Sequence, residues 1–447
     1  MIENESSRLS RRVPVSPGVK VMVATILLMM TVTWVLAVAR FQVNGLFSDQ
    51  WNLSEAILHG DGPLALFTWQ HGPHRQGLAF VFTSWIWELS GWDTRIEALW
   101  GVAWLVGAAG MMVAWKYRLS GRFTWADLWL PVAALAMRQY ETIITTPNLS
   151  HSVFPLVLLL AAAWGVARPM TWGSWLGVGG IGAIALFTGF GIFVWLGLGW
   201  VVALQLGRVM RMDIWRGGMG AAIGGAVLAV ALGFFLWGYA LNSASSGATF
   251  PHWPLGDYFK FVVVMLASRM DLTGGTTVGY GAGSVLLIVS GLILVHASWR
   301  VSRDERPAPA LTTAAMLMAA GLGYAFFTAA GRVHLGIEAG EAPRYTSLMI
   351  ACWLGILAWA CASDRVVWRI GAALLGWAMV VAPWIDLKER ELVDWPGTMG
   401  MSDATRIAIE YSNNQKIEWL SVWEETGDWR AAEAAVPQAI HGQAEEV

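Results

Sequence analysis

Long apolar segments separated by short polar ones recur along most of this chain. A run of about 20 apolar residues crosses a hydrocarbon core of about 30 Å as a helix. Inside lipid such a run must be helical, because lipid offers backbone groups no hydrogen-bond partners. The pattern predicts about eleven membrane-spanning helices, at approximately Val21–Ala39, Ala98–Trp115, Trp125–Met137, Ser152–Ala167, Trp172–Phe187, Ile192–Leu206, Gly217–Tyr239, Val278–Ser298, Leu311–Ala330, Thr346–Cys361 and Val367–Val381.

The polar segments at the two ends frame this region. We predict a cytoplasmic tail at 1–20, a transmembrane domain at 21–383 and an outer C-terminal tail at 384–447. Apolar residues recur at helical spacing in the tail sequence IEWLSVWEETGDWRAAEAA, which predicts a small helical appendage. Of the 447 residues 56% are hydrophobic and 13% charged, against roughly 25% charged in soluble domains. The fold class expected is an all-α polytopic membrane protein.

Basic residues favour alternate loops, and this gives an orientation. Cytoplasmic loops carry an excess of Lys and Arg. One set of alternate segments holds sixteen of the 29 basic residues and only seven of the 31 acids. We therefore expect the N-terminus in the cytoplasm and, with an odd number of spans, the C-terminus outside.

The first outer loop, 40–97, follows the first span. Its second half, Gln76 to Trp92, is apolar, and a crossing there would invert the charge pattern downstream. We expect a helix at the outer interface, where Trp85, Trp87 and Trp92 act as anchors. The glycine-rich stretch Gly275–Gly283 is expected to be a flexible outer turn.

The same loop gathers titratable side chains within about 30 residues: Asp49, Glu55, His59, Asp61, His71, His74 and Arg75. An acid beside a bilayer is costly unless it is solvated or paired. Asp49 is therefore either a solvated loop acid or a catalytic base that takes a proton from an incoming hydroxyl.

Arg75 and His74 are candidates for the other half of such a reaction. Arginine presents a fork of donors to phosphate oxygens, and histidine adds one more. The alternative for Arg75 is a structural salt bridge. His71 and His74 are spaced like metal ligands, so a divalent metal stays open although no cofactor is indicated.

Two further outer turns carry charge beside apolar spans, and either could face the first loop. MRQYETIITTPNLSH contains Glu141, and GRVHLGIEAGEAPRY contains Arg344 and Tyr345. We predict that Glu141, Arg344 and Tyr345 help to bind the substrate. The alternative for Arg344 is a side chain that reaches to lipid headgroups.

At these residues the chain resembles the C-type glycosyltransferase superfold, which includes protein O-mannosyltransferases and aminoarabinose transferases. The likeness lies in a first span, an acid at Asp49, and a short outer helix with a Gly-Asp turn (SEAILHGDG) before the second span. HGPHRQGLAF resembles an Asn-Glu-His-Arg segment of bacterial members. Gly72 and Pro73 stand where that segment has Asn and Glu, so only His74 and Arg75 carry over.

The resemblance implies a bacterial inner-membrane enzyme that transfers a sugar from a polyprenyl-phosphate donor on the outer face. Asp49 would be the base, Arg75 and Arg344 would bind the lipid phosphate, and His74 would orient it. The acceptor is unspecified, and nothing indicates nucleic-acid binding. Two other classes stay open: a transporter or flippase, and a non-catalytic membrane protein of the same fold.

Overall fold

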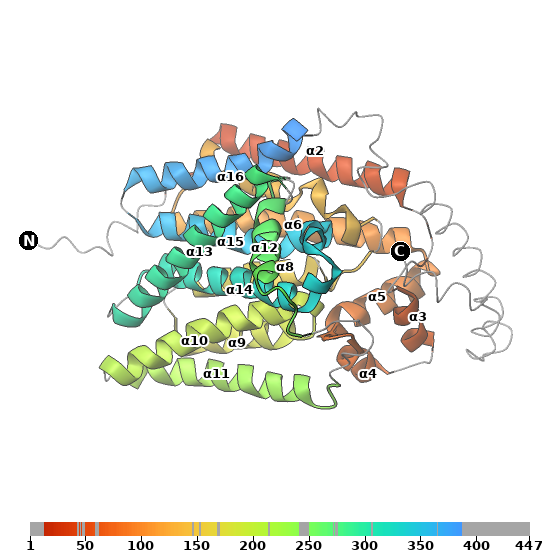
Figure 1. The fold of residues 1–447 in the computed structure, drawn as a ribbon, viewed down its shortest axis with the longest axis horizontal. Helices are drawn as coiled ribbons and strands as arrows, with labels where there is room; N and C mark the ends of the chain where they lie inside the picture. The colour runs from red at the N-terminus through yellow and green to blue at the C-terminus, as the bar shows by residue number, and fades with distance from the viewer. Residues whose placement is uncertain are drawn as a thin grey trace, which may run out of the picture.

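The computed structural model describes residues 13–42, 44, 46, 50–58, 62–144, 147–151, 153–167, 170–212, 215–240, 250–270, 272, 276–304, 307–363 and 365–386. Most of the C-terminal tail and Asp49 lie outside these residues. The described chain is almost entirely helical (Figure 1). Its N-terminal third contains α2 (Pro17–Phe41), α3 (Gln50–Leu58), α4 (Pro63–Thr68), a hairpin of β1 (Gln70–His71) and β2 (His74–Arg75), α5 (Gly77–Ser90), α6 (Thr94–Ser120), η1 (Trp125–Asp127), α7 (Trp129–Ala134) and η2 (Met137–Thr142).

The remaining elements form most of the bundle. In chain order they are α8 (Val153–Val166), α9 (Trp172–Ala185), η3 (Gly189–Gly191), α10 (Ile192–Met212), α11 (Trp215–Leu236), α12 (Gly256–Ser268), α13 (Thr277–Arg303), α14 (Pro309–Arg332), η4 (Val333–Leu335), η5 (Ile337–Glu341), η6 (Pro343–Tyr345), α15 (Thr346–Ala362) and α16 (Val366–Asp386).

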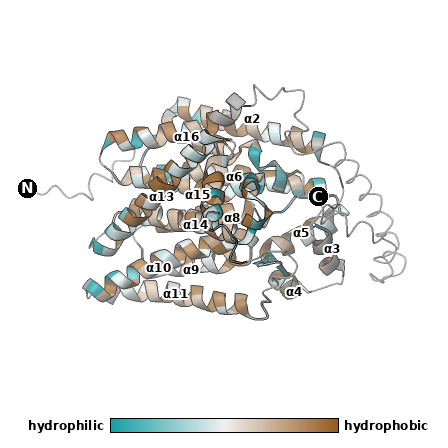
Figure 2. Ribbon diagram, viewed as in Figure 1, coloured by the Kyte–Doolittle hydropathy of each residue, from teal (hydrophilic) through white to brown (hydrophobic). Residues whose placement is uncertain are grey.

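Seven helices within the described ranges are long and apolar enough to cross a membrane. They are α2, α6, α10, α11, α13, α14 and α15, and the spans of α10, α14 and α15 also include the adjoining 3-10 turns η3, η4 and η6. Figure 2 shows hydrophobic residues along these helices and hydrophilic ones toward their ends. An all-α protein with several membrane-spanning helices is therefore confirmed. Ten of the eleven predicted spans coincide with helices, of which α8 and α9 have only 14 residues each.

The centre of the bundle is formed by α14 and α15, which are largely buried, while α2 and α13 lie outside them (Figure 1). Glycines allow the close approach. A Cβ atom on Gly197 of α10 would lie 2.6 Å from the carbonyl oxygen of Met316 in α14. One on Gly321 of α14 would lie 2.6 Å from Cys352 Sγ in α15. Small residues at helix contacts are how helices pack tightly in lipid, where the hydrophobic effect contributes little.

The predicted span Trp125–Met137 is not a single helix. The chain there forms η1, the six-residue α7 and η2 in succession. At its start Asp127 forms a salt bridge with Lys116 at the end of α6, N···O 3.0 Å. At its other end Glu141 pairs with Arg344, just before α15. The segment therefore runs between the two ends of the bundle, but in broken form.

Buried side chains compensate for this break. The last carbonyl groups of α7 and the residue after it lack partners within a continuing helix. Inside the membrane, non-helical backbone is tolerated only where other protein groups form hydrogen bonds with its N–H and C=O groups. Two of these groups come from distant parts of the chain: Arg269 Nη2 donates to the oxygen of Ala133, and Trp34 Nε1 donates to that of Leu135 at 2.9 Å. The third is local, since Gln139 of η2 donates through Nε2 to the oxygen of Ala134 at 2.8 Å.

Three local expectations change. Trp87 does not lie at an interface: it is fully buried and its indole N–H bonds to Glu97, while Trp85 is exposed as expected. The glycine-rich stretch is largely helical, because α13 begins at Thr277. α12, which the sequence pattern missed, packs against α13 and the 3-10 turn η5.

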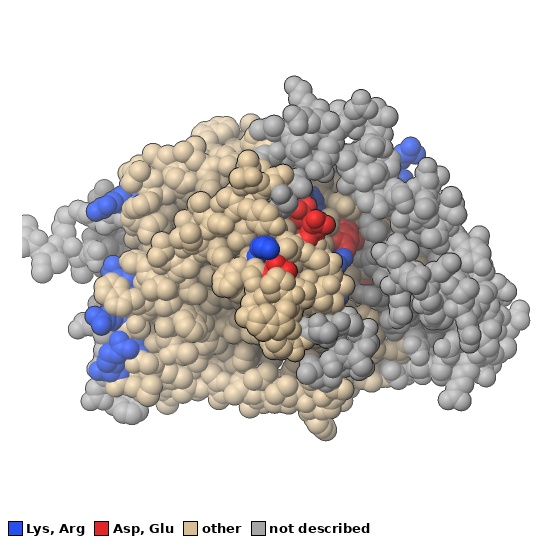
Figure 3. All heavy atoms as spheres, in the orientation of Figure 1, with Lys and Arg blue, Asp and Glu red and all other residues tan. Residues whose placement is uncertain are grey.

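The two ends of the bundle differ in charge. Figure 3 shows Lys and Arg side chains gathered at one end, where α10 and α13 end in Arg211, Arg300 and Arg303. Acidic side chains lie in the middle of this face, over the region of α12 and η5. The gathering of basic groups at one end agrees with the predicted cytoplasmic side, whose assignment stays a prediction.

Candidate functional site

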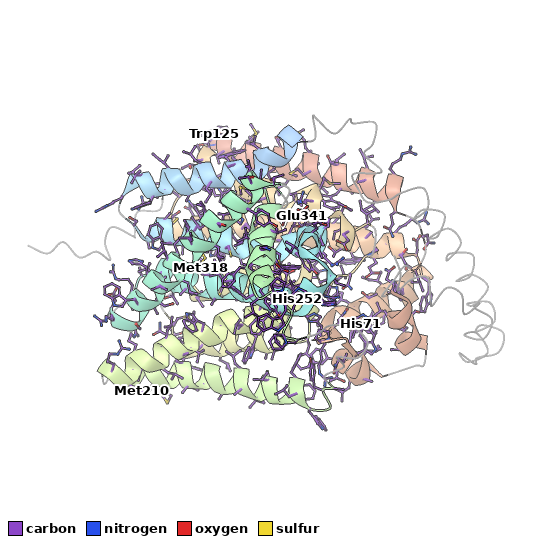
Figure 4. The ribbon with its side chains drawn as sticks, in the orientation of Figure 1. His71, Trp125, Met210, His252, Met318 and Glu341 are labelled. Carbon is purple, nitrogen blue, oxygen red and sulfur yellow. The ribbon has the colours of Figure 1, made fainter. Side chains whose placement is uncertain are left out.

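Three connections predicted to carry the site meet at the end of the bundle opposite the basic one. They are the β1–β2 hairpin, the segment from η2 to residue 151, and the turns η4 to η6. In Figure 4, His71 of the hairpin and Glu341 of η5 lie in the same half of the molecule, away from Met210 in α10. The aromatic ring of Phe190, in the turn η3 between α9 and α10, links the three connections.

Arg75 fixes the hairpin to the neighbouring helices. It is 4% exposed and its guanidinium donates to three backbone carbonyls. Nε bonds to Phe235 at 2.7 Å, Nη2 to Trp237 at 2.6 Å, and Nη1 to Thr68. These carbonyls belong to the ends of α11 and α4. The salt bridge considered for Arg75 is replaced by bonds to neutral groups, which give this arginine a positioning role.

His74 faces a second histidine. Its ring lies edge-on to His151 and to Phe190, with centroids 6.0 and 5.2 Å away. The pKa of His74 is lowered to about 3, mainly by burial and to a smaller extent by the charge of its neighbours. Those neighbours are His151, Arg332 and His71. His74 is therefore neutral at physiological pH and can offer one N–H, not a positive charge, to a ligand.

A network of amides and a hydroxyl holds His151 in place. Gln76 Nε2 lies 3.1 Å from His151 Nε2, and Asn148 Nδ2 lies 3.2 Å from His151 Nδ1. The hydroxyl of Ser150 donates to Gln76 Oε1 at 2.7 Å. Gly189 makes this packing possible, because its φ is +57° and a Cβ atom there would lie 2.7 Å from the carbonyl oxygen of Ser150. An imidazole has at most one acceptor nitrogen, so the tautomer of His151 decides which of the two amide groups donates a hydrogen bond to it.

Glu141 and Arg344 form a bidentate contact across 203 positions of sequence. Glu141 accepts the backbone N–H of Arg344 at 3.0 Å and a bond from its Nη1. The guanidinium also lies over the ring of Tyr345, 5.2 Å from its centroid. Both side chains are partly exposed, so the pair is accessible from outside the bundle. The described structure therefore brings three of the sequence-predicted site residues into contact: Glu141, Arg344 and Tyr345.

Two buried phenols lie between this pair and Phe190. Tyr324 and Tyr345 are almost fully buried, and their rings are 6.3 Å apart. The hydroxyl of Tyr324 has no hydrogen-bond partner among the described residues, and the side chain of Tyr345 lies against the guanidinium of Arg344. A buried polar group without a partner costs free energy, so the Tyr324 hydroxyl is a donor available to an added acceptor.

Positive charge is concentrated near these phenols. Arg332 ends α14 just before η4, and Arg344 lies within η6. Burial lowers the pKa of Arg269, and the nearby Arg138 adds to this effect. Glu141 is the acid that pairs with this group in the described residues. Such an arrangement suits an oxyanion such as a phosphate group.

No group of three His, Cys, Asp or Glu side chains in the described ranges could hold a metal ion. Asp49, the leading candidate for the base, lies outside those ranges, so its position relative to His74 and Arg344 stays a prediction. Three residues that contribute to the site were not singled out from the sequence: Gln76, Arg269 and Glu97. Of these three, only Glu97 could have been noticed in the sequence, because it is an acid at the start of an apolar run. The same pattern is typical of an ordinary helix N-terminus.

Comparison of the chain with protein-family models, with curated proteins and with solved structures gave no match.

Proposed function

We propose that this chain is a membrane glycosyltransferase that uses a polyprenyl-phosphate-linked sugar at the outer face of the bacterial inner membrane. The observation that carries the proposal is the cluster of Arg344, Glu141, Tyr324 and Tyr345 at one end of an apolar bundle. A phosphate at headgroup depth needs cationic donors and hydroxyls at that level, and this cluster supplies both.

In the proposed reaction an acceptor hydroxyl attacks the anomeric carbon of the sugar. The new carbon–oxygen bond forms on the face opposite the phosphate, and the bond from the carbon to the phosphate oxygen breaks. Asp49 takes the hydroxyl proton. Polyprenyl phosphate leaves with the bonding electrons, and its added charge is stabilised by Arg344 and by the neutral N–H of His74.

We further propose eleven crossings, with the broken segment from η1 to η2 as the third. This gives a cytoplasmic N-terminus and an outer C-terminus. The salt bridge of Asp127 at one end of that segment and that of Glu141 at the other support the crossing. The arginines that end α10 and α13 then lie on the cytoplasmic side, as the positive-inside rule requires.

The test uses the full chain in proteoliposomes with candidate polyprenyl-phosphate sugars, and follows release of polyprenyl phosphate. We expect release by the wild type and a loss of at least about 100-fold in Asp49→Asn, the order of a general-base contribution. Arg344→Gln should also reduce release, and Glu88→Gln, an exposed carboxylate on α5, serves as the control. Equal release by wild type and Asp49→Asn would remove Asp49 as the base.

A transporter or flippase is the competing proposal, and Glu97 favours it. Ionisable side chains inside membrane helices frequently belong to transport pathways, and Glu97 is 1% exposed in α6. Exchange of labelled sugar across proteoliposomes without release of polyprenyl phosphate would support transport. Binding of the donor with neither exchange nor release would support a non-catalytic protein.

A further inference from the structure

The carboxyl group of Glu97 is enclosed by hydrogen-bond donors from two other helices. Trp87 Nε1 lies 3.0 Å and Gln50 Nε2 3.4 Å from Oε2, and Thr83 Oγ1 lies 3.0 Å from Oε1. Trp87 and Thr83 belong to α5, and Gln50 begins α3. An isolated buried charge is very costly, so this carboxyl group must either be stabilised by these bonds or become neutral by binding a proton.

The three partners fit both protonation states. An indole N–H and an amide N–H can only donate, so Oε2 acts as an acceptor whether or not the carboxyl group carries a proton. A threonine hydroxyl can donate or accept. Thr83 therefore donates to Oε1 of the carboxylate, and accepts from the O–H on Oε1 of the acid. A proton can be gained or lost here without any change of partner.

The surroundings favour a proton over a metal cation. Two N–H groups point at the oxygens, and positive hydrogens in those positions repel a metal ion. Within the described chain Glu97 has no salt-bridge partner. Among the described side chains, Glu88 is exposed on α5, Asp93 and Arg95 pair with each other before and in α6, and His151 contacts Gln76 and Asn148.

A small cavity adjoins the carboxyl group. It has a volume of about 10 Å³, room for about one water molecule. The polar residues that line it include Glu97, Thr83, Gln50, Gln76 and Ser150. The amide of Gln76 also bonds to His151, which faces His74. A water in this cavity would lie between Glu97 and the polar network at the end of the bundle.

We propose that Glu97 is a reversible proton-binding site, which exchanges its proton with the outer solution through this cavity. The bound species is a single proton, taken up by the carboxylate as Oε1–H and released to a water molecule. The inference rests on the geometry of Glu97 and does not depend on the proposed glycosyl transfer.

Infrared difference spectroscopy of the full chain in lipid tests this. The carbonyl stretch of a protonated carboxyl group should appear as the pH is lowered and disappear reversibly as it is raised. Other carboxyl groups of the chain also give such bands, so we expect one component of the wild-type band to be kept in Glu88→Gln and lost in Glu97→Gln. The same pH-dependent spectrum in wild type and Glu97→Gln would overturn the proposal.

A second variant keeps the carboxyl group, in case Glu97→Gln fails to fold. Thr83→Val preserves shape but removes the hydroxyl that accepts from the acid. The carboxyl band should persist and shift to higher frequency, because it has lost a hydrogen bond. An unchanged frequency would overturn the assignment to Glu97.

A change of solvent from H₂O to D₂O tests the exchange of the proton. The wild-type band should shift as fast as the bands of other groups that exchange hydrogen with the solvent. A band that never shifts would contradict exchange through the cavity.

Discussion

His74 illustrates how one buried side chain can couple stability to pH. Its pKa is lowered from 6.5 to about 3 in the folded chain, so the unfolded chain binds more protons between these values. The free energy of unfolding is therefore not reduced by His74 above pH of about 6.5, and it decreases as the pH falls from there toward about 3. We expect the thermal unfolding midpoint to fall on acidification in this window, and to fall less in His74→Asn.

The control for that measurement is His252→Asn, a histidine outside the cluster that lies 3.6 Å from Asp257. It should leave the pH dependence of the midpoint closer to that of the wild type. A slope that is the same in wild type and His74→Asn would assign the effect to other groups, of which His151 and His71 are the nearest.

Arg75 allows a direct separation of positioning from ligand binding. Its guanidinium bonds to the carbonyls of Thr68, Phe235 and Trp237. A lysine cannot reach all three with one ammonium group. We expect Arg75→Lys to lower the free energy of unfolding by about 1–3 kcal/mol, since buried carbonyls lose their partners. Denaturant or thermal unfolding of the protein without ligand measures this.

Arg95→Lys is the matched control, because Arg95 forms an exposed pair with Asp93 and such pairs contribute about 0–1 kcal/mol. If Arg75→Lys keeps the wild-type stability and yet loses donor binding, Arg75 acts on the phosphate, as the sequence resemblance implied, and not on the hairpin.

The sequence located several site residues but not their contacts. His74, Arg75, Glu141 and Arg344 were found because charge beside an apolar span is expensive and therefore conspicuous. That Glu141 meets Arg344 could not be found, since 203 positions separate them and no periodicity relates two turns. Glu97 was overlooked because an acid in the first turns of a helix needs no special explanation.

At the scale of elements, the hydropathy pattern predicted continuous helices well and a broken one poorly. Ten of eleven predicted spans are helices because any run of apolar residues in lipid must close its own hydrogen bonds. The segment from η1 to η2 breaks this pattern since Trp34, Gln139 and Arg269 satisfy its carbonyls. Donors from distant parts of the chain, such as Trp34 and Arg269, cannot be recognised from the periodicity of hydrophobic residues.

The broken segment yields a prediction for Trp34. Its indole N–H is the donor to Leu135 in the centre of the molecule. Trp34→Phe keeps an aromatic ring but removes the donor, and we expect a loss of about 1–3 kcal/mol in the free energy of unfolding. Trp100→Phe on α6, where the side chain is largely exposed, is the control. Equal stability of the two variants would mean that the carbonyl of Leu135 finds another donor.

At the scale of the whole molecule, the distribution of charge along the bundle predicts its orientation. Lys and Arg side chains gather at one end, where α10 and α13 end (Figure 3). The positive-inside rule counts charges that stay outside the bilayer and does not depend on how the helices pack, and it predicts that this end faces the cytoplasm.

α13 provides the most direct test of that orientation. Its 27 residues, Thr277 to Arg303, span about 40 Å, more than a hydrocarbon core of about 30 Å. In a background with Cys352→Ala and Cys361→Ala, single cysteines at positions 277 and 303 should react with an impermeant reagent from opposite sides. The proposed orientation requires that Thr277→Cys be labelled in intact cells and Arg303→Cys only after the membrane is opened. Labelling of both in intact cells would exclude α13 as a crossing, and the reverse pattern would place the Arg344 site in the cytoplasm, where a donor on the outer face could not reach it.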